Sequence, residues 1–152
     1  MMNNIEEIQA FDRLKTKVLK YVLYKKRTEK EIRQKFSMED ENMLEDVIEY
    51  LKEAGYISDK EYIERSIQEF INLKNLSLKE VNYKLISKGI NRNALQNYIY
   101  NHKEELVEYE LNSAKNIIIK KQNIMEENEI REYLRKKGYV EEIINLAFEE
   151  II

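Results

Sequence analysis

Apolar residues recur along the chain at spacings of three and four, and polar residues fill the positions between them. This period places each apolar set on one face of an α-helix. No window of four or more residues alternates convincingly between apolar and polar positions, so the sequence predicts an all-α protein without a sheet. The stripes are Phe11, Leu14, Val18 and Val22; Leu44, Val47, Ile48 and Leu51; Ile63, Ile67, Phe70 and Ile71; Ala94, Leu95, Tyr98 and Ile99; Val107, Leu111, Ala114 and Ile118; and Ile143, Ile144, Ala147 and Phe148.

The stripes belong to an internal repeat. When the chain is shifted by 49 positions, Val81 falls on Ile130 and Gly89 falls on Gly138, and no gap is needed. A shift in the other direction places Ile32 on Val81, although the first copy then lacks about two residues and has no Lys-Gly turn. The sequence therefore indicates three copies of one module.

Each copy is expected to contain a long helix, a short helix and a third helix after a turn. A single helical triplet cannot bury its apolar faces alone, whereas stacked copies can. We therefore expect about nine helices in three tandem repeats that form one continuous, elongated and curved array. The predicted repeats cover residues 1–57, 58–102 and 103–152.

Two of the predicted short helices begin with a capping box. Thr28 precedes Glu31 by three residues, and Ser77 precedes Glu80 in the same way. In this motif the hydroxyl accepts from the third amide of the helix, and the glutamate accepts from the amide of the cap residue. The third copy has Glu126 at the cap position, which is a poorer cap.

Glycines mark the expected helix ends. Gly55, Gly89 and Gly138 each follow a helical stripe, where a left-handed residue closes the last turn and glycine adopts that conformation without steric cost. Asp59, just before the stretch KEYIERSI, is expected to cap the next helix.

Composition narrows the class of protein. The 152 residues include no cysteine, so disulfides and thiolate metal sites are excluded. The chain also has no proline and three glycines, and 36% of its residues are charged. The opening MMNNIEEIQAF lacks the apolar core of a signal peptide, and no apolar run approaches the roughly 20 residues that span a bilayer. We expect a cytoplasmic protein with no cofactor and no metal.

The order of these motifs resembles the RecX family of bacterial regulators of the recombinase RecA. The resemblance rests on YKKRTEKEIRQKF followed by VIEYLKEAGYISDKEYIERSI, and on the ending Lys84-Leu85-Ile86-Ser87-Lys88-Gly89-Ile90 of the second copy. The residues that match the family pattern in the first two copies are Thr28, Glu31, Leu51, Gly55, Tyr56, Ile57, Asp59 and Tyr62.

The resemblance implies a partner and an activity. Members of the family bind RecA–DNA filaments along the helical groove and hinder their growth or promote their disassembly. The ATPase, strand-exchange and co-protease activities of RecA fall as a result. By likeness, the partners expected here are RecA and its filament on single-stranded DNA, with weak direct DNA binding, no membrane contact and a monomeric chain.

The charge pattern is independent of that resemblance. Residues 13–35 hold ten basic and two acidic side chains, a net charge of +8, whereas residues 39–53 hold one basic and seven acidic side chains, a net charge of −6. A basic helix followed by an acidic helix suits a partner of mixed charge, such as a protein filament on DNA. Equally, the two helices neutralise each other across a packed hairpin.

Charge clustering selects the candidate binding residues for the filament. They are Lys17, Lys20, Lys25, Lys26, Arg27 and Arg33 in the first copy, and Lys84, Lys88 and Arg92 in the second.

Most of the eleven tyrosines flank apolar stripes and are expected at core edges, whereas Tyr24, Tyr83 and Tyr100 are expected to be exposed.

No catalytic residues are predicted. His102 is the single histidine, and no nucleophile stands at a spacing from it that is typical of a catalytic motif. The sequence also has no glycine-rich phosphate-binding loop. Two other binding classes remain open. One is a helix-turn-helix DNA regulator built from residues 31–36 and 43–57. Its second helix is acidic, which argues against this class because DNA phosphates would repel that helix. The other is a helical-repeat scaffold for a different protein.

Overall fold

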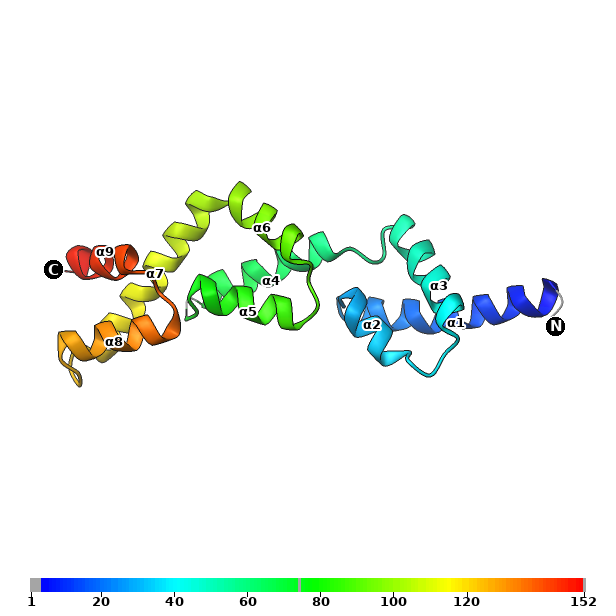
Figure 1. Cartoon of the computed structure of the whole chain (residues 1–152), viewed down its shortest axis with the longest axis horizontal. Coiled ribbons are helices and arrows are strands. Elements are labelled where there is room, and N and C mark those ends of the chain that lie inside the picture. The colour runs from blue at the N-terminus through cyan, green and yellow to red at the C-terminus, as the bar shows by residue number, and fades with distance from the viewer. Residues whose placement is uncertain (1–3, 74, 152) are drawn as a thin grey trace. The chain divides into compact units, whose positions relative to one another are not determined.

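The computed structural model describes residues 4–73 and 75–151, and over these residues it contains nine helices and no strand (Figure 1). The predicted all-α class is confirmed. The chain divides into two compact units. The first comprises residues up to Tyr62 together with Lys88–Ile90, and the second comprises Ile63–Ser87 and the chain from Asn91 onward.

The first unit packs its long helix against the acidic helix. Its helices are α1 (Asn4–Tyr24), α2 (Glu29–Lys35), α3 (Glu41–Glu53) and the first turn of α4 (Asp59–Leu73). The apolar stripes of α1 and α3 face each other, and α2 contributes Ile32 to the same core. The buried residues of this core are Leu14, Val18, Val22, Ile32, Leu44, Val47, Ile48, Leu51 and Ile57.

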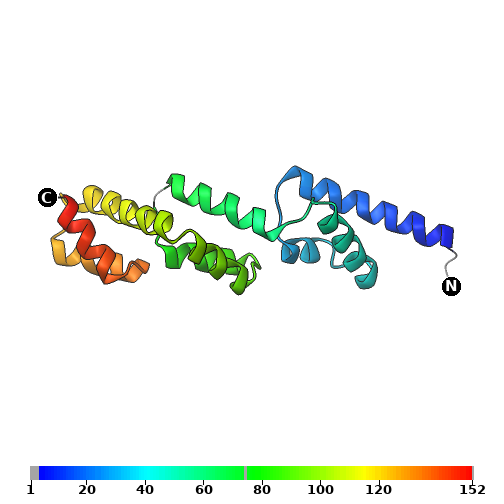
Figure 2. The same cartoon turned by 90° about the horizontal axis from the view of Figure 1, so that it is seen from above.

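The second unit is organised around α7, which lies beside both α8 and α9 (Figures 1 and 2). Its helices are the remainder of α4, α5 (Leu78–Ser87), α6 (Arg92–Asn101), α7 (Lys103–Lys121), α8 (Glu127–Lys137) and α9 (Glu141–Ile151). The buried residues of its largest cluster are Ala114, Ile117, Ile118, Ile130, Leu134, Tyr139, Ile143, Ile144 and Ala147.

The expectation that Asp59 caps a helix is wrong. α4 begins at Asp59 itself, and Ser58 is the cap, because its Oγ accepts a hydrogen bond from the Glu61 N–H at 3.3 Å. Ser58 and Glu61 have the spacing of a capping box, which competes with the pattern built on Asp59. The Asp59 carboxyl instead turns toward the backbone of Glu29 at the start of α2.

The stripe expected on the seventh helix is also partly wrong. Val107 is 41% exposed, whereas Leu106, Ser113 and Ile117 are buried beside the correctly placed Ala114. The buried face is wider than one stripe because α7 packs against α6, α8 and α9. Helices in contact with several neighbours lose the simple alternation of one apolar and one polar face.

Among the described residues, no helix combines the length and the apolar character that crossing a membrane requires.

Candidate functional site

Two of the candidate cations on the first unit stand free on the surface. Lys20 on α1 and Lys25 just after it are exposed, and within residues 4–73 and 75–151 neither has an ion-pair partner. Their neighbours in the set are partly engaged. Lys17 Nζ lies 3.4 Å from a Glu39 oxygen, and Lys26 Nζ lies 3.0 Å from a Glu61 oxygen.

Arg33 is held within the first unit. Its guanidinium donates two hydrogen bonds to Glu45, at 2.7 and 3.1 Å, and a third to Glu29 at 3.2 Å. The hydrogen bond from Arg33 lowers the pKa of the Glu45 carboxyl, and the same bond raises the pKa of Arg33. Arg27 is half-buried, with its guanidinium carbon 4.2 Å from the centre of the Tyr21 ring.

The basic and acidic segments of the first unit therefore neutralise each other only in part. Three ion pairs join them, namely Lys17–Glu39, Arg33–Glu45 and Lys52–Glu29. All three are exposed enough to be screened by solvent, so each contributes little to stability. The cations at positions 20 and 25 lie outside these pairs and are available to a ligand.

The candidate cations of the second copy fall into both compact units. Lys84 on α5 and Arg92 on α6 are exposed residues of the second unit. Lys88 belongs to the first unit, where its Nζ lies 4.0 Å from a Glu31 oxygen.

The start of α2 holds more than a helix cap. Thr28 and Glu31 make both hydrogen bonds of the capping box, each at 3.1 Å. The fully buried Thr28 hydroxyl also donates to the backbone carbonyl of Lys88 at 2.6 Å. The backbone of Gly89, at φ +96°, passes so close that a Cβ there would lie 2.3 Å from Lys30 Cβ. We call this set of contacts the first junction.

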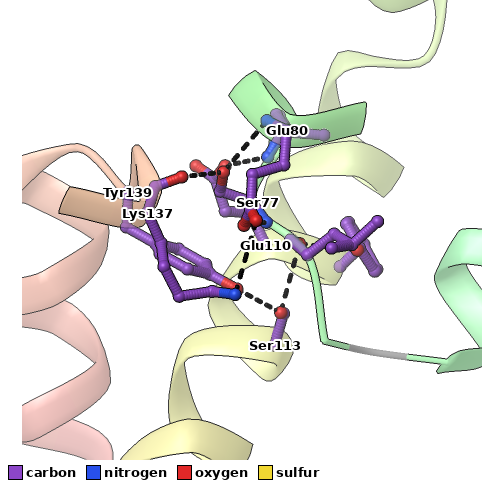
Figure 3. Close-up of polar contacts among 9 residues, drawn as sticks. Ser77, Glu80, Glu110, Ser113, Lys137 and Tyr139 are labelled. Atoms are coloured by element: carbon purple, nitrogen blue, oxygen red, sulfur yellow. Dashed lines mark hydrogen bonds and ion pairs between the residues drawn. The ribbon is translucent and has the colours of Figure 1, made fainter. Parts of the chain in front are cut away.

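The start of α5 repeats these contacts in the second unit (Figure 3). Ser77 and Glu80 form the box, and the buried Ser77 hydroxyl donates to the Lys137 carbonyl at 2.7 Å. Lys137 Nζ lies 3.4 Å from a Glu80 oxygen. A Cβ on Gly138, at φ +104°, would lie 2.8 Å from the side chain of Lys79. We call this set the second junction.

The two junctions have the same spacing along the chain, since each hydroxyl bonds a carbonyl 60 residues later. This recurrence supports the three-repeat organisation, which remains our proposal. The start of α8 differs, because Glu126 makes no side-chain capping bond.

The sequence patterns missed a buried polar cluster beside the second junction (Figure 3). A Glu110 carboxylate oxygen accepts from the Leu78 N–H at 2.6 Å, and Tyr109 donates to the Leu76 carbonyl at 2.6 Å. Ser113 Oγ lies 2.5 Å from the Tyr139 hydroxyl. Burial raises the pKa of both Glu110 and Tyr139. The only hint in the sequence is a glutamate and a serine on the inward face of a helix.

The three tyrosines expected on the surface are confirmed there. Tyr24, Tyr83 and Tyr100 are between 76% and 87% exposed. The described residues contain no group of three acidic or histidine side chains placed to hold a metal ion.

The solvent face of α3 carries Glu45, Asp46 and Glu49. DNA phosphates would repel this acidic face, so α3 is poorly suited to be a DNA recognition helix.

Comparison of the sequence finds relatives along nearly the whole chain. The regulatory protein RecX of Staphylococcus carnosus is 28% identical over 156 residues, covering 97% of this chain. The regulatory protein RecX of Finegoldia magna is 35% identical over 136 residues, covering 80% of this chain and 63% of the relative. The chain spans 58% of the length of the S. carnosus protein. No protein-family model matches the chain.

Comparison of the fold finds similar solved structures. A crystal structure of RecX from Lactobacillus salivarius superimposes with a TM-score of 0.78 at 23% identity, covering 94% of this chain and 97% of the other. A second crystal structure, of a regulatory protein RecX, gives a TM-score of 0.77 at 20% identity. The relatives are named as regulatory proteins and not as enzymes.

Proposed function

We propose that the chain is a member of the RecX family and that it restrains the recombinase RecA by binding RecA assembled on single-stranded DNA, because it resembles proteins named regulatory protein RecX along nearly its whole length. In this proposal it limits filament growth, and the ATPase, strand-exchange and co-protease activities of RecA fall as a consequence. The observation that carries the proposal is the likeness to proteins named regulatory protein RecX over 97% of the chain. The chain acts by binding alone, as a cytoplasmic monomer without a cofactor.

The free cations are the first contacts we propose. A filament of protein on DNA exposes phosphates, and cations that lack an internal partner are attracted to them without losing an existing ion pair. Lys20 and Lys25 meet this condition on the first unit, and Lys84 and Arg92 are the exposed candidates of the second.

The paired cations contribute less in this proposal. Lys17, Lys26 and Arg33 would have to exchange Glu39, Glu61 and Glu45 for a filament group. An exposed ion pair contributes up to about 1 kcal/mol, so the exchange is feasible but consumes part of the gain. Arg33 has the most to lose because it donates to two glutamates.

The test is the ATPase rate of the host's RecA on single-stranded DNA as this chain is titrated in at moderate salt. The proposal predicts a dose-dependent fall at less than one chain per RecA. Binding to DNA without RecA is measured first, so that competition for the DNA is recognised. A variant with Lys25, Lys26 and Arg27 changed to Glu is expected to inhibit less while circular dichroism shows it folded.

The remaining function classes give different results in the same experiment. A DNA regulator would retard duplex DNA with a sequence preference and without RecA. A scaffold for another protein would ignore both DNA and RecA. An unchanged ATPase rate with a folded chain would reject restraint of RecA.

A further inference from the structure

A groove of ≈ 600 Å³ lies within the first unit, between the start of α1 and the start of α3. Its apolar lining comes from Ile8, Phe11 and Met43, and its acidic lining from Glu7, Asp40 and Asp46. None of the candidate cations lines it. The groove is therefore a surface separate from the one proposed to contact the filament.

Ile5 and Ile8, at the start of α1, do not belong to the core of the first unit, whereas Phe11 and Met43 pack against its edge. The buried residues of α1 begin at Leu14, whereas Ile5 is 66% exposed and Ile8 is 60% exposed. The first turns of α1 extend past α2 and α3 in both views (Figures 1 and 2). Helical turns without tertiary packing are marginal in water, and adjacent exposed apolar residues mark interaction sites.

The charge on the groove defines the chemistry of its partner. The groove lining combines the carboxylates of Glu7, Asp40 and Asp46 with the apolar side chains, and none of the described residues that line it is basic. An apolar strip bordered by like charges selects a ligand with an apolar stripe and opposite charges on its flanks. An amphipathic helix with lysine or arginine beside its apolar face has this arrangement.

We propose that this groove binds a basic amphipathic helix of a partner protein, whose apolar face packs on Ile8, Phe11 and Met43. The carboxylates of Glu7 and Asp46 pair with cations on the two flanks of that helix. The interaction requires neither DNA nor the contacts proposed for Lys20 and Lys25, and it is tested without RecA.

The probe is a fluorescent synthetic helix of about 18 residues, with leucine along one face and lysine elsewhere, titrated with the intact chain and followed by anisotropy. One matched probe has glutamate in place of lysine, and another has the same composition in scrambled order. The lysine helix is expected to bind about tenfold more tightly than either matched probe, because only it presents both the stripe and the charge.

Variants locate the binding surface. Ile8→Gln leaves the charge unchanged and is expected to weaken binding about tenfold, because it removes apolar burial. Asp46→Lys is expected to weaken binding through repulsion. The matched control is Ile124→Gln, which changes an apolar side chain that is 77% exposed elsewhere and is expected to leave affinity unchanged.

Three results would overturn the proposal. Equal affinity for wild type and Ile8→Gln would place the helix elsewhere. Equal affinity for the lysine helix and the scrambled probe would show that binding depends on the overall charge of the probe and not on its apolar stripe. Concentration-dependent dimers in sedimentation velocity that Ile8→Gln abolishes would make a second copy of the chain the occupant of the groove.

Discussion

At the scale of single residues, the three glycines share a conformation but differ in their surroundings. Gly55, Gly89 and Gly138 have φ between +84° and +104°, where other residues are strained. A Cβ on Gly55 would meet nothing within 4 Å, whereas one on Gly89 would meet Lys30 Cβ at 2.3 Å. Lys30 Cβ is fixed by the backbone of α2, so the neighbour cannot move aside cheaply.

Gly55→Ala and Gly89→Ala therefore form a matched pair. Gly55→Ala is expected to lower the free energy of unfolding by about 1 kcal/mol through backbone strain alone. Gly89→Ala is expected to lower it by at least about 2 kcal/mol, because strain is added to the clash with Lys30. Urea unfolding followed by circular dichroism measures both. Equal losses would show that the close approach at the first junction does not constrain the folded state.

The Thr28 hydroxyl has two hydrogen-bond partners at the first junction. Thr28→Val keeps the shape but leaves the Glu31 N–H and the Lys88 carbonyl without that partner. Losing a cap and leaving buried polar groups unpaired is expected to cost about 2–3 kcal/mol. The control is Thr16→Val, since the exposed Thr16 hydroxyl donates only to the Asp12 carbonyl. If both variants unfold at the same urea concentration, the junction bond contributes nothing.

Local patterns were enough to place the starts of α2 and α5. Thr28 and Glu31 are three residues apart, so the box hydrogen bonds depend only on nearby sequence. The bond from Thr28 to the Lys88 carbonyl joins residues 60 apart, and no local pattern reports it. The wrong prediction for Asp59 has a local cause, because Ser58 and Glu61 have the spacing of a capping box and Ser58 is the residue whose side chain accepts from the Glu61 N–H.

At the scale of helices, α7 supplies an acidic cap to α5. The Glu110 carboxylate accepts from the Leu78 N–H, the first amide of α5, at 2.6 Å. A carboxylate is favourable at a helix N-terminus, but Glu110 is only 5% exposed. Burial raises the pKa of this carboxyl, and the bond from Leu78 opposes the rise.

The raised pKa of Glu110 gives a pH-dependent prediction. The folded chain holds this proton more tightly than the unfolded chain, so its contribution to stability falls as pH rises above the ordinary carboxyl pKa of 4.5. Glu110→Gln still has an oxygen that accepts from Leu78 but has no charge to bury. Its free energy of unfolding, relative to wild type, should therefore increase between about pH 4.5 and pH 7.

Urea unfolding at several pH values measures this difference. Glu108→Gln, on the exposed face of the same helix, is the control for removing one negative charge. A relative stability of Glu110→Gln that stays constant or falls with rising pH would contradict the burial of a charged Glu110.

The helices themselves were largely predictable, but the faces they bury were less so. The stripe Leu44, Val47, Ile48 and Leu51 is buried as a whole, because α3 has one main packing partner in α1. The stripe through Val107 was misplaced because α7 has several partners. A period of 3.6 residues reports one buried face and cannot tell how many neighbours a helix will meet.

At the scale of the whole molecule, the chain resembles proteins named regulatory protein RecX, and neither periodicity nor composition alone could point to that family. The candidate site was predictable only as charge. The sequence groups Lys20, Lys25 and Arg33 in one basic run, whereas the structure separates the free lysines from an arginine bound to Glu45 and Glu29. Which cations have internal partners depends on how α2 packs beside α3, and a linear charge count does not contain that information.

The most direct test of the central claim is the affinity of the dye-labelled chain for preassembled RecA filaments on single-stranded DNA, measured by anisotropy. Wild type is expected to bind. Lys20→Glu with Lys25→Glu is expected to bind about tenfold or more weakly, because two free cations are reversed. The control, Lys103→Glu with Lys120→Glu, makes the same charge change at exposed lysines of α7 and is expected to bind within about twofold of wild type. A folded wild-type chain that ignores the filament, or equal binding by both double variants, would contradict the account.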